Sequence, residues 1–405
     1  MTRNTDVVVV GGGYAGVLAA NRLTQRDDVT VTLINPRRTF VERLRLHQLV
    51  GGSDDAVVDY QEVLAERVRL VVDAVTRIDA AARSVTLTSG GTVGYDYLIY
   101  TVGSGSADPS VPGAADFAHP IATLEDAQRL RSVMDDNPAT ARVTVVGAGP
   151  SGIETAAELA ETGRAVTLVC GGDLGPYLHP RGRRSVARQL ARLGVTVVAG
   201  PGTEVTGVTR DAVRLADGRD VQGAVTVWTA GFGVPDLAAR SGLSADALGR
   251  LLTDETLTSV DDPRIVAAGD SAAPSGLPYR MGCQAAVQMG PQAAQTVLSR
   301  IVGERPAPVH VGFAGQCISL GRRAGIFQFA RRNDTAISLY VAGRPGARLK
   351  EFVVKHTVQQ LAEEARKPGA GSRWMKDATR QDLLRAAEHD ETRTVQAPPA
   401  TERAA

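Results

Sequence analysis

Two short glycine patterns have the residue types and spacing that could hold a pyrophosphate. Residues 11–16 read GGGYAG and residues 147–152 read GAGPSG, so each has glycine at its first, third and sixth positions. In such a pattern the first glycine allows a tight turn, the second lets the backbone approach a phosphate, and the third lets a helix pack closely on a strand. The residues predicted to bind a cofactor here are Gly11, Gly13, Tyr14, Ala15 and Gly16 in the first turn and Gly147, Gly149, Pro150, Ser151 and Gly152 in the second.

Each glycine turn lies between a predicted strand and a predicted helix. Residues 6–10 and 142–146 are rich in valine, as is typical of buried parallel strands, and residues 17–23 and 153–160 read as helices. The start of each helix offers free N–H groups and the positive end of its dipole to a phosphate. Because the same order of elements occurs twice, we predict that the chain binds two dinucleotides.

A second strand follows each predicted helix, and its end is where such folds place the group that binds a ribose. Asn35 and Cys170 stand there, so neither position carries a carboxylate that would repel a 2′-phosphate. The choice between NADH and NADPH therefore stays open. Cys170 is more typical of a packed small side chain than of a nucleophile. The arginines that follow it either reach a phosphate or belong to a solvated helix start; they are Arg181, Arg183 and Arg184.

Length and composition limit the classes of protein that are possible. A chain of 405 residues suggests two or three domains, and 45 basic against 44 acidic residues argue against nucleic acid as the main partner. The three cysteines are far apart in sequence, which argues against a disulfide framework, a metal site and a redox dithiol. No signal peptide or membrane-spanning stretch is evident, so we expect a soluble, cytoplasmic monomer or homodimer with at most peripheral membrane contact.

Three further turns close predicted strands, and they contain Thr101 and Gly103, Thr229 and Gly231, and Gly269 and Asp270. The helix predicted from Met281 would point its N-terminal end at the first cofactor. Residues 36–60 read as irregular, and Arg43 there lies either close to that cofactor or on a solvated face. His47 has no acidic partner in the nearby sequence, which favours a structural role over a catalytic one.

The C-terminal part of the chain has a different pattern of predicted elements. Strands at 316–320, 325–330 and 336–341 and a helix at about 348–365 predict a small antiparallel sheet with one helix. The predicted domains are a first cofactor domain in two parts (1–110 and 246–310), a second cofactor domain (111–245), a C-terminal α+β domain (311–380) and a disordered tail (381–405).

In this order the motifs resemble the two-dinucleotide-binding-domain flavoproteins of the pyridine nucleotide-disulfide oxidoreductase superfamily. Within it the chain is most similar to type II NADH dehydrogenases and to the ferroptosis-suppressor and apoptosis-inducing-factor-like oxidoreductases. The resemblance implies an α/β fold with two Rossmann-like domains, one for FAD and one for NAD(P)H, and a small C-terminal α+β domain.

The resemblance also implies roles for single residues. Asn35 would bind the FAD ribose, Val75 would meet the adenine through its backbone, and Asp270 would contact the ribityl and phosphate part. Glu154 would lie near the nicotinamide. Residues 283–288, CQAAVQ, resemble the A-Q-x-A-x-Q quinone-site motif, so Gln284 would contact the flavin and Gln288 would help to bind a quinone. The alternative is that both glutamines bind backbone or the third domain.

The function implied is an FAD-dependent NAD(P)H oxidoreductase that passes hydride to flavin and electrons to an acceptor, with a quinone as the first candidate. A ferredoxin-like carrier or a biosynthetic intermediate is an alternative acceptor. A protein of another class, a slow-turnover NAD(P)H-sensing flavoprotein similar to apoptosis-inducing factor, is the other alternative.

Overall fold

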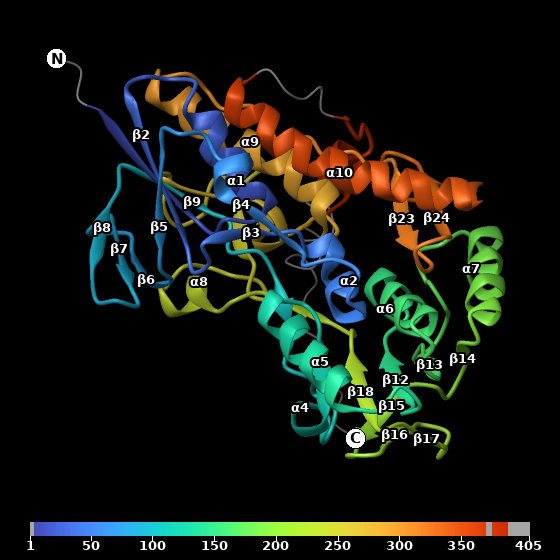
Figure 1. Cartoon of the computed structure of the whole chain (residues 1–405). Coiled ribbons are helices and arrows are strands. Elements are labelled where there is room, and N and C mark those ends of the chain that lie inside the picture. Colours follow the sequence, from blue (N-terminus) through green and yellow to red (C-terminus); the bar gives the residue numbers. More distant parts are fainter. Residues whose placement is uncertain (1–3, 370–374, 388–405) are drawn as a thin grey trace, which may run out of the picture.

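The computed structural model describes residues 4–369 and 375–387, and Figure 1 shows them coloured along the chain. The first unit is built on a five-stranded parallel sheet in the order β21-β9-β1-β2-β5. Its strands are β1 (Thr5–Val10), β2 (Val29–Asn35), β5 (Val68–Val72), β9 (Tyr97–Tyr100) and β21 (Ile265–Ala267). The edge strand β21 comes from far along the chain, so the second unit is inserted within the first.

Smaller elements complete the first unit. An antiparallel sheet follows β5 and contains β6 (Val75–Asp79), β7 (Ser84–Leu87) and β8 (Thr92–Gly94). The helices are α1 (Tyr14–Leu23), α2 (Leu46–Gly51), α3 (Tyr60–Val63), α8 (Leu237–Arg240) and α9 (Cys283–Ile301). The remaining short elements are β3 (Thr39–Val41), η1 (Arg43–Arg45), β4 (Val57–Asp59), β20 (Leu251–Thr253), η2 (Gly269–Ser271) and β22 (Ala272–Pro274).

The second unit repeats the first in its sheet. Its five parallel strands are ordered β11-β18-β12-β13-β14, so β12 and β13 take the places of β1 and β2. The parallel strands are β11 (Ala118–Pro120), β12 (Val143–Val146), β13 (Val166–Val169), β14 (Thr196–Val198) and β18 (Val225–Trp228). An antiparallel sheet is formed by β15 (Val205–Val208), β16 (Ala212–Leu215) and β17 (Asp220–Gln222). The helices are α4 (Ala114–Phe117), α5 (Leu124–Asp136), α6 (Pro150–Glu161) and α7 (Pro180–Arg192).

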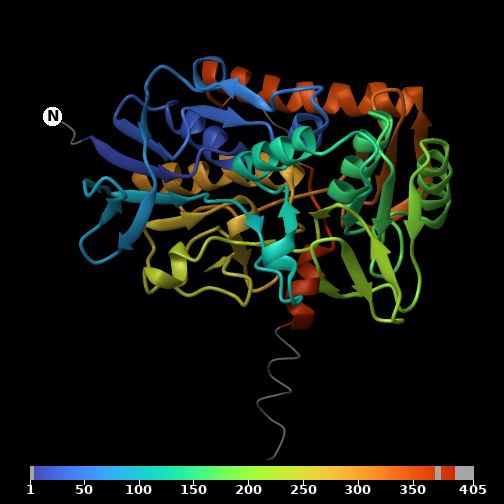
Figure 2. The ribbon, with the colours of Figure 1, turned by 60° about the horizontal axis from the view of Figure 1, so that its bottom comes forward.

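Two features join the units. The two stretches of chain that pass between the units pair with each other as a short antiparallel ribbon. It consists of β10 (Gly105–Ser106) and β19 (Phe232–Gly233). The C-terminal sheet of β23 (Gly315–Ser319), β24 (Gly325–Ala330) and β25 (Ala336–Gly343) packs against α10 (Arg344–Arg366). Figure 2 shows α10 running along one face of the molecule from the second unit to the first. The predicted α/β class with two Rossmann-like units and a small C-terminal part is confirmed, while the predicted domain boundaries remain a proposal.

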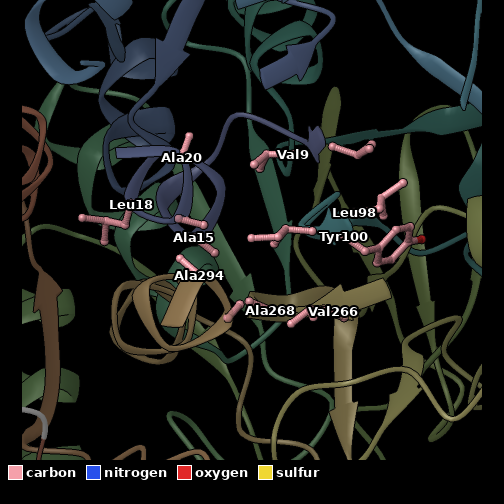
Figure 3. Close-up of a cluster of buried hydrophobic side chains, with 14 of the residues drawn as sticks. Val9, Ala15, Leu18, Ala20, Leu98, Tyr100, Val266, Ala268 and Ala294 are labelled. Carbon is pink, nitrogen blue, oxygen red and sulfur yellow. The ribbon is translucent and has the colours of Figure 1, made fainter. Parts of the chain in front are cut away.

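The core of the first unit depends on a close approach of α1 and α9. Figure 3 shows the small side chains Ala15 and Ala294 where these helices meet beside the strands. A Cβ atom added at Gly290 of α9 would overlap the backbone carbonyl oxygen of Ala15. Glycine at this position therefore sets how closely the two helices can pack.

We expect Gly290→Ala to lower the free energy of unfolding by roughly 1–3 kcal/mol, because the added methyl group must push the helix backbones apart. Chemical denaturation with fluorescence detection measures this change. Gly91→Ala is the matched control, since Gly91 is exposed and the nearest atom to its added Cβ lies at 3.8 Å. Equal stability of the two variants would contradict the packing account.

Three stretches differ from the sequence prediction. Residues 36–60 form short elements rather than an irregular segment, because β3 pairs with β4, eighteen or so residues away, and local sequence does not reveal such a partner. Residues 380–387 are helical, and Arg380 of this segment pairs with Glu255 at 2.7 Å, although a disordered tail was predicted from residue 381. The rest of that predicted tail, 388–405, lies outside the described residues. Within the described ranges no helix has the length and apolar character needed to cross a bilayer.

Candidate functional site

The two glycine turns have the same construction. Gly11 and Gly147 have φ angles of +101° and +125°, which side-chain-bearing residues rarely adopt. A Cβ at Gly16 would overlap the carbonyl oxygen of Gly11, and one at Gly152 would overlap that of Gly147. The first and last glycines of each pattern are therefore needed by the fold itself.

The middle glycines, Gly13 and Gly149, differ from the others. Each stands at the N-cap of a helix, α1 or α6, and neither cap is closed by a side-chain hydrogen bond. A Cβ at either position would meet no atom within 4 Å. The open space beside a free helix N-terminus fits a pyrophosphate, so this part of the structure fits FAD at α1 and a second dinucleotide at α6.

A threonine fixes each turn from the neighbouring strand. Thr101 Oγ1 donates to the carbonyl oxygen of Val10 at 2.9 Å, and Thr229 Oγ1 donates to that of Val146 at 2.8 Å. The strand ends predicted from Thr101 and Thr229 are thus equivalent supports for the two glycine turns.

One cavity receives residues from both units. From the first unit it is lined by Gly13, Tyr14, Ala15, Arg43, His47, Thr101, Gly103, Ser104, Gly269 and Asp270. From the second unit it is lined by Ser151, Glu154, Thr155, Trp228, Thr229 and Gly231. Met281, Gly282, Cys283 and Ala286 at the start of α9 close it, as predicted for the N-terminal end of that helix. The two predicted dinucleotide sites therefore open into a common space.

A hydrogen-bond network holds one wall of this cavity. Asp270 Oδ2 accepts a hydrogen bond from Ser104 Oγ at 2.7 Å, and its Oδ1 accepts one from the Gly282 N–H at 2.8 Å. Arg43 donates to Ser104 Oγ at 3.1 Å and lies 3.6 Å from Asp270 Oδ2. Of the two interpretations given for Arg43, the structure supports a position at the cofactor site.

An ion pair lies at another part of the cavity lining. Glu154 is 7% exposed, and its Oε1 accepts hydrogen bonds from Lys350 Nζ at 2.9 Å and from the Ser319 N–H at 2.8 Å. Its Oε2 faces His47 Nδ1 at 3.6 Å. The His47 Nε2 atom is buried and has no hydrogen-bond partner among the residues that the structure describes.

The charges in this group follow from burial and from neighbouring charges. Burial acts to raise the pKa of Glu154, but Lys350 and the hydrogen bonds outweigh burial and lower it. Burial acts to lower the pKa of Lys350, but the Glu154 carboxylate outweighs burial and raises it. For His47 burial prevails and lowers the pKa to about 4 despite the attraction of Glu154. At neutral pH the group therefore holds a carboxylate, an ammonium and a neutral imidazole.

The two glutamines of the α9 motif are not among the residues that line this cavity. Gln288 is 4% exposed; its Nε2 donates to the Gly312 carbonyl at 3.0 Å and its Oε1 accepts from the Gly312 N–H at 3.2 Å. Gln284 Oε1 accepts from the Ala314 N–H at 3.4 Å. These contacts fit the alternative given for both glutamines, binding of backbone in the segment before the C-terminal sheet.

Three other predicted residues also lie outside the cavity lining. Asn35 is buried, and its Oδ1 accepts from the Gly12 N–H at 3.0 Å, so it shapes the first glycine turn. Val75 opens β6, and Cys170 follows β13 with its side chain packed in the core of the second unit. The packing of Cys170 agrees with the interpretation favoured from the sequence.

Lys350 and the role of His47 were not found from the sequence. Lys350 stands on a helix 196 positions beyond Glu154, and the acidic partner of His47 lies 107 positions away. No local spacing signals such a pairing. Cys283 and Cys317 both come within electrostatic range of Lys350, although they are distant in sequence, and burial raises the pKa of Cys283 to about 12. Both cysteines are free thiols.

The comparison with protein families agrees with the geometry. Residues 5–296 match the family described as pyridine nucleotide-disulphide oxidoreductase, and the chain belongs to this family.

Individual relatives narrow the resemblance. An NADH dehydrogenase-like protein of Mycobacterium tuberculosis is 29% identical over 353 residues, which cover 80% of this chain and 87% of that protein. The type II NADH:quinone oxidoreductase Ndh of the same organism is 29% identical over 354 residues, covering 75% of this chain and 74% of its own length. Among solved structures, the sulfide:quinone oxidoreductase of Aquifex aeolicus has a TM-score of 0.73 at 19% identity and covers 94% of this chain and 95% of its own. NDH2 of Plasmodium falciparum also has a TM-score of 0.73, at 15% identity, and the match covers 91% of this chain and 99% of that chain. At such low identities these two structures show a similarity of fold.

Proposed function

We propose that this protein is an FAD-dependent NAD(P)H oxidoreductase that delivers electrons to a quinone. The observation that carries the proposal is the common cavity, because Gly13–Ala15 of the first glycine turn and Ser151 and Glu154 of the second line the same space. FAD, when bound there, would supply the redox chemistry, because a flavin can take up two electrons from a nicotinamide and pass them on singly or in pairs.

The residues of the chain bind and orient the reactants. The N-termini of α1 and α6 would hold the two pyrophosphates. Asp270 and Arg43 from the first unit would contact the flavin, and Gly231 and Glu154 from the second unit would contact the nicotinamide, since all four residues line the common cavity. A hydride needs close and oriented reactants more than acid–base help, and a shared cavity provides such proximity. Glu154, ionised and held by Lys350, is placed to orient a polar group of a substrate.

His47 is proposed to accept a hydrogen bond from a ligand in this cavity. The Glu154 carboxylate favours the tautomer with hydrogen on Nδ1, which leaves the buried Nε2 as an acceptor at the edge of the cavity. With its pKa lowered to about 4, the imidazole carries no proton that it could give to a quinone at neutral pH, so the protons that a reduced quinone takes up must come from water or from another group.

The quinone itself is proposed from the relatives. Proteins named as type II NADH:quinone oxidoreductases and as a demethylphylloquinone reductase align with 75–80% of this chain. Steady-state turnover with NADH and a soluble quinone, a ferredoxin or oxygen as the acceptor tests this choice. The proposal requires the quinone to give the highest kcat/KM, and faster turnover with ferredoxin would replace it with the carrier alternative.

Discrimination between NADH and NADPH is expected to be modest. Cys170 occupies the end of β13, so no carboxylate at that position repels the 2′-phosphate of NADPH. We expect the two kcat/KM values to differ by less than about a hundredfold, or roughly 2.7 kcal/mol. A parent enzyme that prefers NADH by far more than this limit would show that another residue discriminates.

A further inference from the structure

A second cavity lies beyond the Glu154–Lys350 ion pair. Its volume is about 490 Å³, and it is formed by the turn between β23 and β24, the first turns of α10 and Gln48 of α2. Lys350 lines this cavity and donates to Glu154, which lines the first cavity. The two cavities are therefore separated by a single ion pair.

The lining of this second cavity is strongly basic. Five of its side chains are cationic, namely Arg322, Arg323, Arg344, Arg348 and Lys350, and one is acidic, Glu351. The Glu351 carboxylate is already shared, because Arg45 donates to it at 2.9 Å. Lys350 is balanced by Glu154, and Arg322 lies 3.7 Å from Glu351.

Three arginines of this cavity remain without a counter-charge. Among the described residues, no carboxylate forms an ion pair with Arg323, Arg344 or Arg348, whose side chains are exposed. They come from two walls, because Arg323 belongs to the turn before β24 whereas Arg344 and Arg348 stand one helical turn apart at the start of α10. The N-terminus of this 23-residue helix, which has no side-chain cap, adds positive potential.

This arrangement defines the chemistry of a ligand. Guanidinium groups bind oxyanions through paired N–H donors, and a phosphate presents oxygens in several directions, whereas a carboxylate presents two in one plane. Arginines from the two segments can therefore share one phosphate group or bind neighbouring ones. We propose that this cavity binds a small phosphate-bearing ligand that carries at least two negative charges. Such binding is separate from the electron-transfer activity proposed above, and its test needs no turnover.

Isothermal titration calorimetry with inorganic pyrophosphate tests the proposal, using flavin-loaded protein saturated with NAD+ so that the dinucleotide site at α6 is already filled. We expect saturable binding to one site per chain, with an affinity that falls steeply as salt is added. The variant with Arg344→Ala and Arg348→Ala together should bind at least about tenfold more weakly, because it loses two charged donors. Arg323→Ala removes the donor of the other wall and should also weaken binding. Arg210→Ala is the matched control, an exposed arginine in the turn between β15 and β16, and should bind as the parent does.

Vesicles distinguish the two sources of such a phosphate. Sedimentation with vesicles that contain phosphatidic acid, lost in the Arg344/Arg348 variant and prevented by pyrophosphate, would support a lipid headgroup as the ligand. Pyrophosphate binding without sedimentation would support a soluble phosphate compound. Absence of saturable pyrophosphate binding, or equal affinities in the parent and both arginine variants, would overturn the proposal. Circular dichroism and flavin content of each variant show that it is folded.

Discussion

Gly13→Val is expected to give a folded protein that contains no flavin. The backbone at Gly13 is extended, with φ −80° and ψ −167°, so valine can adopt it, and the added Cβ would meet no protein atom within 4 Å. The valine would instead fill the open space at the N-terminus of α1 where a pyrophosphate fits. The visible absorption of the purified variant, compared with its protein concentration, gives the flavin content.

The glycine at the end of the same turn provides the control. A Cβ at Gly16 would overlap the Gly11 carbonyl, so Gly16→Val should lose the fold together with the flavin. The thermal stability of Gly13→Val must be compared with that of the parent stripped of FAD, because bound cofactor raises the melting temperature by mass action. Full flavin content in Gly13→Val would show that the pyrophosphate does not lie against α1.

Glu154→Gln is expected to destabilise the protein by roughly 3–5 kcal/mol, because it leaves the buried ammonium of Lys350 without its counter-charge. Lys350 is 5% exposed, and its Nζ lies 2.9 Å from Glu154. Chemical denaturation of the flavin-loaded variant measures the loss. The double variant Glu154→Gln with Lys350→Met is the control, and most of the stability should return in it because no unpaired charge remains buried.

The same pair predicts a dependence on pH. The pKa of Glu154 is lowered in the folded state, so its stabilising contribution is present above its ordinary pKa of 4.5 and is lost as the pH falls below that value. The pKa of Lys350 is raised, so its contribution is present below its ordinary pKa of 10.5 and is lost at higher pH. The stability of the parent relative to the double variant should therefore stay constant between these pH values and fall at both ends, because only the parent contains the two titrating groups. A single variant as stable as the parent at neutral pH would contradict the ion pair.

The parts of this site that are local in sequence could be predicted, and the parts that depend on distant partners could not. The sequence indicates the two turns at Gly11–Gly16 and Gly147–Gly152, because a strand, the glycines and a helix follow one another within a few residues. Thr101, Thr229 and Asp270 could be placed because each ends a strand whose carboxyl edge faces the cofactor. Residues 123–126, TLED, have the residue types of a capping box, and Thr123 and Asp126 form one at the start of α5.

Contacts between residues that are distant in sequence explain why the other parts of the site could not be predicted. Gln288 carries a motif that suggests an acceptor site, yet its amide is engaged by Gly312, which a reading of one helix cannot reveal. The sequence favours a structural role for His47 because no acidic partner lies near it in the chain. Its acidic neighbour in space, Glu154, belongs to the other unit. The sequence does not distinguish Lys350 from the other charged residues of its helix, although the fold buries it.

The central claim is that both dinucleotides meet in one cavity, so that hydride passes directly from NAD(P)H to the flavin. Anaerobic stopped-flow mixing of the flavin-loaded protein with NADH, followed by the loss of the visible flavin absorption, tests this most directly. The account predicts rapid bleaching that saturates with NADH concentration and slows when the transferred hydrogen at nicotinamide C4 is replaced by deuterium. Flavin that stays oxidised in the presence of excess NADH would contradict the account.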